Sequence, residues 1–200
     1  MNAQKILKYL GFTFCWMALI VQFILMMQNR VVGEFETIVR FFSFFTILSN
    51  LLVALSFTAE VLEIFPFFRN YKTKIAIVVY ISIVAIVYNV ILRFLWQPTG
   101  FQRITDELLH VINPILFVLF WMNTKDKIYI PYRFILTILI FPLIYLISIL
   151  VMGNFSNYYP YPFVDVFKIG LSQALLNSFF VLLAFVIVAL ITIKYSRRKE

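Results

Sequence analysis

The segment TDELLHVINPILFVLFW, residues 105–121, joins a long apolar run to the single histidine of the chain, His110. Asp106 lies four residues before His110 and Glu107 three, so a helix would place both carboxylates near the imidazole. A carboxylate one turn away can hold an imidazole in one tautomer. Pro114 has no N–H group and would leave the His110 carbonyl without its helical partner. The segment predicts a polar wall that contains a base. The alternative is an interfacial histidine that is hydrogen-bonded to one neighbour.

A second segment, RFFSFFTILSNLL, supplies hydroxyl groups. On a continuous helix Ser43, Thr46 and Asn50 would form one stripe, with Ser49 beside it. A threonine hydroxyl becomes a useful nucleophile when a base removes its proton, and His110 is the base that the chain offers at neutral pH. Thr46 would lie at a comparable depth if the two helices are neighbours. The competing interpretation is that these side chains only pack helices together, as serine, threonine and asparagine often do in membranes.

Arg93 and Asn89 are four residues apart in a third apolar run. Ionisable side chains are costly in hydrocarbon and usually face the interior of a bundle. Two roles fit Arg93, namely neutralising Asp106 or Glu107, or holding a substrate carboxylate through a bidentate pair. Because these charges gather toward the outer half of the predicted bundle, we expect function to reside there.

Long apolar helices must position these side chains. Of the 200 residues, 63% are hydrophobic and 13% are charged, against about 45–50% and about 25% in typical soluble domains. A helix needs about 20 apolar residues to cross a bilayer. The sequence therefore predicts an all-α polytopic membrane bundle in which residues 1–200 form a single domain. Its six spans are expected near Ile6–Met27, Ile38–Ala59, Ile75–Trp96, Asp106–Met122, Phe134–Met152 and Val166–Ile193.

Lysine and arginine are distributed unevenly among the connections. Twelve lie on one predicted side of the membrane, four lie on the other, and Arg93 lies within a span. Cytoplasmic loops carry an excess of basic residues, so both termini are expected in the cytoplasm of a multi-pass protein of the cell membrane. The twelve are Lys5, Lys8, Arg69, Lys72, Lys74, Lys125, Lys127, Arg133, Lys194, Arg197, Arg198 and Lys199, and the four are Arg30, Arg40, Arg103 and Lys168.

Other classes of site find little support. The net charge of +8 fits membrane topology better than a nucleic-acid groove, so no nucleic-acid partner is expected. Cys15 is the only cysteine, which excludes an internal disulfide and a cysteine-rich metal site. With five glycines and no phosphate-binding loop, the sequence speaks against nucleotide binding. We expect no metal and no cofactor, and the oligomeric state is left open.

Four motifs carry a resemblance to known families, namely FFTILSN, LLHVINPIL, FPLIY and YPYPFVDV. In these the chain resembles the bacterial "Pr-six-Pr" membrane proteins and, more distantly, is similar to the androgen-induced protein family of animals. The animal family implies six spans and an intramembrane hydrolase of lipid esters, such as fatty acid esters of hydroxy fatty acids, that uses a threonine and a histidine. The resemblance maps these two residues to Thr46 and His110, with Ser43 and Ser49 as neighbouring hydroxyls.

The sequence thus predicts an intramembrane lipid-ester hydrolase with a threonine nucleophile and a histidine base. Asp106 would orient His110, Asn50 or Ser49 would help to hold the oxyanion, and Arg93 would anchor an acyl or carboxylate head. One alternative is a non-enzymatic transporter or binding protein for a lipid or small amphiphile. Another is a structural or partner-binding subunit. The enzyme hypothesis requires that the helices carrying the threonine and the histidine are neighbours.

Overall fold

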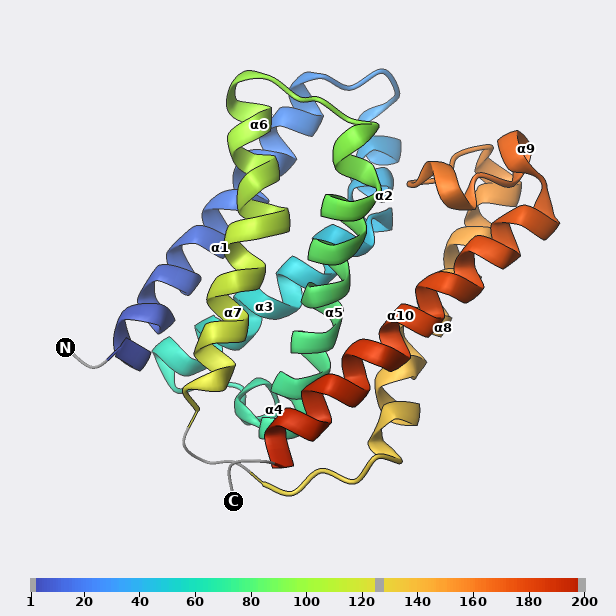
Figure 1. Ribbon diagram of the computed structural model, residues 1–200. Helices are drawn as coiled ribbons and strands as arrows, with labels where there is room; N and C mark the ends of the chain where they lie inside the picture. Colours follow the sequence, from blue (N-terminus) through green and yellow to red (C-terminus); the bar gives the residue numbers. More distant parts are fainter. Residues whose placement is uncertain (1–2, 125–127, 198–200) are drawn as a thin grey trace. The chain divides into compact units, whose positions relative to one another are not determined.

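The computed structural model describes residues 3–124 and 128–197 (Figure 1). Every regular element in these two stretches is helical. The α-helices are α1 (Ala3–Gln28), α2 (Glu34–Ser43), α3 (Phe45–Leu62), α4 (Pro66–Arg69), α5 (Tyr71–Val90), α6 (Gly100–Glu107), α7 (Asn113–Met122), α8 (Phe134–Ser156), α9 (Val166–Ile169) and α10 (Leu171–Arg197). Two short 3-10 helices, η1 (Leu92–Phe94) and η3 (Pro162–Val164), and one π-helical turn, η2 (Leu108–Ile112), complete the set.

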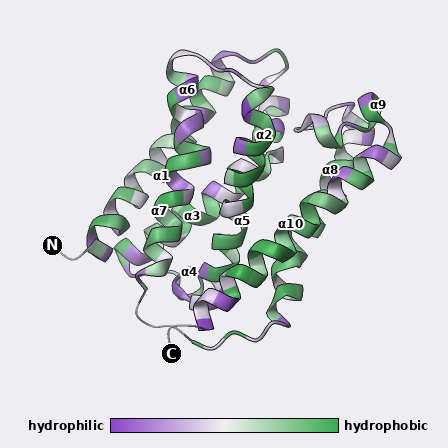
Figure 2. Cartoon of the chain, viewed as in Figure 1, coloured by the Kyte–Doolittle hydropathy of each residue, from purple (hydrophilic) through white to green (hydrophobic). Residues whose placement is uncertain are grey.

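Within the described residues, six helical stretches are long and apolar enough to cross a membrane. They cover Ala3–Gln28, Phe45–Leu62, Tyr71–Phe94, Gly100–Met122, Phe134–Ser156 and Leu171–Arg197. Figure 2 shows the hydrophobic residues that run along these helices, and many large apolar side chains are exposed on their surfaces, where lipid would contact them. The predicted all-α fold with six spans is confirmed, and the chain is a multi-pass membrane protein. The cytoplasmic location of the termini stays a prediction.

Packing contacts divide the chain into two units, and the first, Met1–Ile128, contains α1 to α7. In this unit both α3 and α7 pack against α1 and α5. The core contains Phe57, whose ring centroid lies 5.4 Å from that of Phe117 and 5.2 Å from that of Phe120. Gly11 on α1 lies so close that a Cβ atom there would come within 2.2 Å of the Phe57 ring. This packing brings α3, α5 and the η2–α7 segment together.

The second unit, Tyr129–Glu200, is built on α8 and α10. The loop between these helices, rich in tyrosine and proline, is tied to α10 by Asn177, whose Nδ2 donates a hydrogen bond of 2.9 Å to the Phe163 carbonyl. Phe163 in turn stacks on Tyr161 with 5.3 Å between ring centroids. The residues predicted to form the site all lie in the first unit.

The second predicted span, Ile38–Ala59, is wrong as a continuous helix. Phe44 has an extended backbone (φ −80°, ψ 123°) and separates α2 from α3. The Ser43 hydroxyl donates a hydrogen bond of 2.6 Å to the Arg40 carbonyl, so a side chain satisfies a carbonyl group near the end of α2. Serine competes in this way with backbone hydrogen bonds and favours helix ends. Ser43 and Thr46 therefore do not share one helical stripe.

The fourth predicted span, Asp106–Met122, is wrong at its start. The helical stretch begins at Gly100, so Asp106 and His110 lie inside it rather than at its first turn. The prediction began the span at the charged residues Asp106 and Glu107. In the structure Asp106 contacts Tyr88 and His110, Glu107 pairs with Arg93, and the helix already runs through the residues before them.

The sixth predicted span starts too early, at Val166, because the long helix α10 begins only at Leu171. The short helix α9 ends at Ile169, and Gly170, with φ 77°, separates it from α10. Glycine adopts this left-handed region without the steric cost that a Cβ atom imposes. The first, third and fifth predicted spans agree with helical stretches to within four residues at each end. Of the basic residues used to predict topology, Lys125, Lys127, Arg198 and Lys199 lie outside the described residues.

Candidate active site

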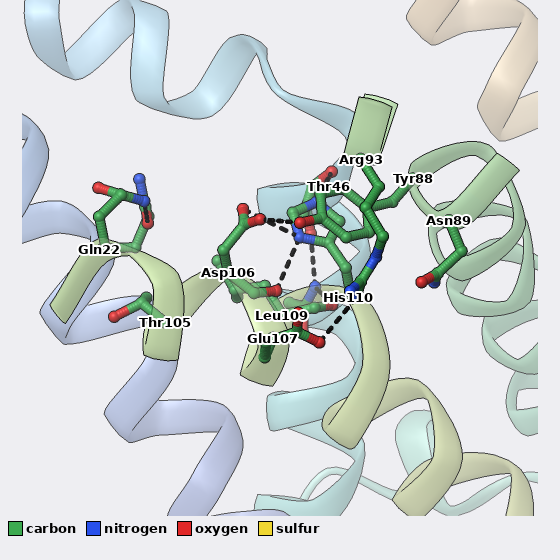
Figure 3. Close-up of polar contacts among 12 residues, drawn as sticks. Gln22, Thr46, Tyr88, Asn89, Arg93, Thr105, Asp106, Glu107, Leu109 and His110 are labelled. Atoms are coloured by element: carbon green, nitrogen blue, oxygen red, sulfur yellow. Dashed lines mark hydrogen bonds and ion pairs between the residues drawn. The ribbon is translucent and has the colours of Figure 1, made fainter. Parts of the chain in front are cut away.

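Segments far apart in the sequence meet at a polar cluster inside the first unit (Figure 3). Helix α3 supplies Thr46, α5 supplies Tyr88, and the α6–η2 segment supplies Asp106 and His110. The Oγ1 atom of Thr46 lies 3.3 Å from the Nε2 atom of His110. Thr46 is 7% exposed and His110 is 8% exposed, so the contact is buried. The two helices that the enzyme hypothesis needs as neighbours are neighbours.

The second ring nitrogen of His110 is held by Asp106. Nδ1 lies 2.9 Å from the backbone carbonyl oxygen of Asp106 and 3.3 Å from the Oδ1 atom of its carboxylate. A carbonyl oxygen only accepts hydrogen bonds, so we assign the proton of the neutral imidazole to Nδ1. Nε2 then has its lone pair available to the Thr46 hydroxyl. General-base removal of the hydroxyl proton requires this tautomer.

The π-helical turn η2 presents the imidazole. Here the Asn113 N–H donates to the carbonyl of Leu108, five residues earlier, instead of the residue four earlier. Pro114 follows in the first turn of α7 and has no N–H to offer. Such turns widen a helix locally and occur frequently at functional sites. The sequence reveals the proline, but the wider turn was not predicted.

Tyr88 received no role from the sequence, yet it contacts two other members of the cluster, His110 and Asp106. Its ring stacks on the His110 imidazole with 4.0 Å between centroids and 15° between planes. Its hydroxyl donates a hydrogen bond to the Oδ2 atom of Asp106. Tyr88 is 4% exposed, and a buried tyrosine hydroxyl usually has a polar partner. This need for a polar partner, together with the charged Arg93 five residues later, is the feature of the sequence that could have indicated a role for Tyr88 in the site.

Arg93 lies at the edge of the cluster and pairs with Glu107. Its NH2 nitrogen is 2.8 Å from the Oε2 atom of Glu107, and the guanidinium lies 5.1 Å from the centroid of the Tyr88 ring. Of the two carboxylates proposed as partners from the sequence, Glu107 is the one that Arg93 contacts. Both side chains of this pair are more than one-third exposed, so the pair is accessible from outside the protein.

Asn50 connects the helices that carry the threonine and the histidine. Its Nδ2 donates to the Thr46 carbonyl at 2.9 Å and to the Leu109 carbonyl at 3.1 Å. Its Oδ1 accepts a hydrogen bond of 2.9 Å from Nδ2 of Asn113. Both amide hydrogens are therefore engaged within the protein and are not offered to an oxyanion. The structure supports a positioning role for Asn50.

The two neighbouring serines have surroundings different from those of Thr46. Ser43 lies at the end of α2, and its hydroxyl proton points to the Arg40 carbonyl. Ser49 is fully buried, and among the described residues its Oγ atom has no hydrogen-bond partner. The predicted role of Ser49 at the oxyanion gains no contact that would support it.

The break at Phe44 changes the electrostatic setting of Thr46. Thr46 is the second residue of α3, whereas a continuous helix would have placed it in mid-helix. The first turn of an α-helix carries the positive end of the helix dipole and stabilises nearby negative charge. The nucleophile candidate thus lies where an alkoxide or an oxyanion would be favoured.

No family model, curated protein or solved structure matches the chain. Among the described residues, no group of three or more histidine, cysteine, aspartate and glutamate side chains is placed to hold a metal ion. The chemistry of the site must therefore be argued from Thr46, His110 and their partners.

Proposed function

We propose that the chain is an intramembrane hydrolase of lipid esters, with Thr46 as the nucleophile and His110 as the general base. The observation that carries the proposal is the 3.3 Å approach of Thr46 Oγ1 to an imidazole whose Nδ1 contacts Asp106. Productive catalytic hydrogen bonds measure about 2.6–3.2 Å, and those in ligand-free proteins are often longer and tighten when substrate binds. The resemblance to the androgen-induced proteins assigns the same two residues.

In the first half-reaction the Thr46 oxygen attacks the ester carbonyl carbon while Nε2 of His110 accepts the hydroxyl proton. The imidazolium formed in this step carries protons on both nitrogens, and Asp106 stabilises it through Nδ1. Collapse of the tetrahedral intermediate breaks the ester bond, and the imidazolium protonates the departing alcohol. The products of this half-reaction are the free alcohol and an acyl group bonded to Thr46.

The second half-reaction repeats the proton transfer with water. The oxygen of a water molecule attacks the acyl carbon while His110 accepts a proton from that water. The bond between the acyl carbon and the Thr46 oxygen then breaks, and the imidazolium returns the proton to Thr46. The fatty acid leaves and the side chains regain their starting states. Two easier steps thereby replace one difficult hydrolysis.

Helix α3 stabilises the negative charge that develops in both steps. Thr46 lies in the first turn of α3, so the carbonyl oxygen of an acyl group on Thr46 would lie near the positive end of the helix dipole. Oriented dipoles at the reacting atoms stabilise a transition state because they need no rearrangement during the reaction. Asn50 supports this geometry by fixing the Thr46 carbonyl to the η2 segment.

A lipid ester is the class of substrate that this location favours. The first unit contains four helical stretches that are long and apolar enough to cross a membrane. Large apolar side chains are exposed on α2, which ends two residues before α3, among them Phe42 at 47%. The reacting pair is itself buried. An ester carried by an acyl chain can reach such a site from the bilayer, whereas a water-soluble ester would have to leave water first.

Hydrolysis by purified protein in detergent tests the proposal. A panel of fluorogenic acyl esters that differ in chain length would be compared between wild type, Thr46→Val and His110→Gln. We expect kcat/KM to fall at least about 1,000-fold in both variants, because each removes a member of one proton-transfer unit. Thr46→Ser, which keeps a hydroxyl group, should retain part of the activity.

Matched controls separate chemistry from folding. Thr192→Val removes a threonine hydroxyl from α10 in the second unit, where Oγ1 bonds to the Val188 carbonyl, and should leave turnover unchanged. Ser43→Ala and Ser49→Ala test the neighbouring hydroxyls. Activity that persists in Thr46→Val and His110→Gln would contradict the hydrolase mechanism and favour the lipid-binding or transport alternative.

A further inference from the structure

We propose that Tyr88 is a positioning residue of this site, which holds the Asp106 carboxylate and the His110 ring in the arrangement that directs Nε2 to Thr46. The inference rests on the function proposed above, because it assigns a further residue to the same reaction. Tyr88 itself does not touch the Thr46 oxygen in this scheme and acts through the other two side chains.

The hydroxyl of Tyr88 fixes one end of the carboxylate. It donates to Oδ2 of Asp106, while Oδ1 of the same carboxylate faces Nδ1 of His110 at 3.3 Å. A carboxylate has two oxygens joined rigidly, so a hydrogen bond at one oxygen determines where the other points. With Oδ2 held by Tyr88, Oδ1 stays directed toward Nδ1 of His110.

The ring of Tyr88 fixes the plane of the imidazole. The two rings are nearly parallel, with an angle of 15° between them, and their centroids lie 4.0 Å apart. At this distance the Tyr88 ring opposes rotation of the imidazole about the Cβ–Cγ bond of His110. Rotation by half a turn would exchange the faces of the imidazole and carry Nε2 away from Thr46. The Arg93 guanidinium lies 5.1 Å from the Tyr88 ring centroid, and the attraction of this cation to the ring helps to hold Tyr88 in place.

Two substitutions separate these contributions. Tyr88→Phe removes the hydroxyl and keeps the ring, whereas Tyr88→Leu removes both. We expect kcat to fall by about 10- to 100-fold in Tyr88→Phe, the range expected for one hydrogen bond to a charged group, and further in Tyr88→Leu. KM should stay within about twofold, because a positioning residue that does not bind substrate changes the chemical step. Tyr71→Phe, on the same helix, is the matched control.

A spectroscopic measurement tests the same inference without using activity. The chain contains one histidine, so in protein labelled with ¹⁵N-histidine every imidazole signal reports His110. Wild type should show the neutral tautomer with the proton on Nδ1. Tyr88→Phe and Tyr88→Leu should show signals partly averaged between the two tautomers, because the Asp106 carbonyl still accepts from Nδ1 while the carboxylate is no longer held. Tyr71→Phe should match wild type.

The outcomes distinguish this inference from the function on which it rests. A wild-type tautomer signature in both Tyr88 variants would overturn the positioning role, whatever the wild-type activity. An averaged signature in both variants would support it, even if the wild type hydrolyses no ester and the proposed function fails. Loss of kcat with an unchanged tautomer would also overturn it, because Tyr88 would then act by another route.

Discussion

Asp106 contacts His110 through both its backbone and its side chain. The Nδ1 atom of the imidazole lies 2.9 Å from the Asp106 carbonyl oxygen and 3.3 Å from its Oδ1 atom. Two acceptors for one proton secure the tautomer more firmly than the carboxylate alone would. The backbone contact cannot be removed by changing the side chain. It therefore limits how far a substitution at position 106 can lower kcat.

Asp106→Asn should therefore lower kcat by about 10- to 100-fold. An Asn side chain can present its NH₂ group to Nδ1 and so favour the wrong tautomer, and in a Ser-His-Asp triad this replacement costs about 10⁴-fold. We expect a smaller loss here because the Asp106 carbonyl continues to accept from Nδ1. Steady-state kinetics with the best ester of the panel would measure it, with Asp165→Asn in the second unit as the control. A loss as large as that of His110→Gln would contradict the role of the backbone contact.

Asn50→Leu should destabilise the protein by about 1–3 kcal/mol. The substitution leaves the Thr46 and Leu109 carbonyls and the amide of Asn113 without the hydrogen bonds that Asn50 now makes. The midpoint of thermal unfolding in detergent would report the change. Activity measured well below that midpoint should also fall, because Thr46 and His110 lose the link between their helices. Unchanged stability together with unchanged activity would show that the link is dispensable.

Gly11→Val should destabilise the first unit. The added side chain would enter the space of the Phe57 ring, since a Cβ atom alone would lie 2.2 Å from it. Phe57 has 0% exposure and lies against two other rings, so it has no room to retreat. Overpacking of this kind costs about 1–3 kcal/mol. Gly33→Ala is the control, because no atom lies within 4 Å of its would-be Cβ; equal unfolding midpoints for the two variants would contradict the packing described here.

Substitutions of Lys74 and Glu60 should have strongly non-additive effects on the free energy of unfolding. Lys74 Nζ lies 2.5 Å from Glu60 Oε1, with the side chains 6% and 18% exposed. Glu60→Ala leaves a buried ammonium group without its partner, which typically costs about 3–5 kcal/mol. The double variant Glu60→Ala with Lys74→Met should be more stable than Glu60→Ala alone. A thermal-unfolding double-mutant cycle measures this coupling, and simple additivity of the two changes would contradict it.

The membrane-spanning helices were predictable, because their position depends mainly on contact with lipid rather than on contacts between particular residues. A surface that meets lipid must be apolar, so spans can be recognised by their composition, and five of the six ranges overlap their helices closely apart from end effects. Thr46 and His110 could be paired because one histidine offers the only neutral-pH base and because polar side chains in a membrane turn inward. The first inference needs no knowledge of which helices touch, whereas the pairing had to assume that the helices carrying Thr46 and His110 are neighbours.

The remaining features depend on tertiary contacts. The segment around Phe44 is as apolar as its neighbours, so composition does not show that the helix breaks there and restarts just before Thr46. The contact between Tyr88 and Asp106 depends on α5 lying beside the α6–η2 segment, and short-range spacing carries no such information. The sequence suggested a role for Asn50 at the oxyanion but did not reveal its hydrogen bonds, because one of them reaches Leu109, 59 residues away in the sequence.

Detection of an acyl group on Thr46 tests the central claim most directly. Purified protein would be mixed with an activated acyl ester, quenched in acid within one turnover, digested and analysed by peptide mass spectrometry. The account predicts an acyl adduct on Thr46 in the wild type that is strongly reduced in His110→Gln and absent from Thr46→Val. An adduct on Ser43, Ser49 or Cys15 instead, or continued hydrolysis by Thr46→Val, would contradict it.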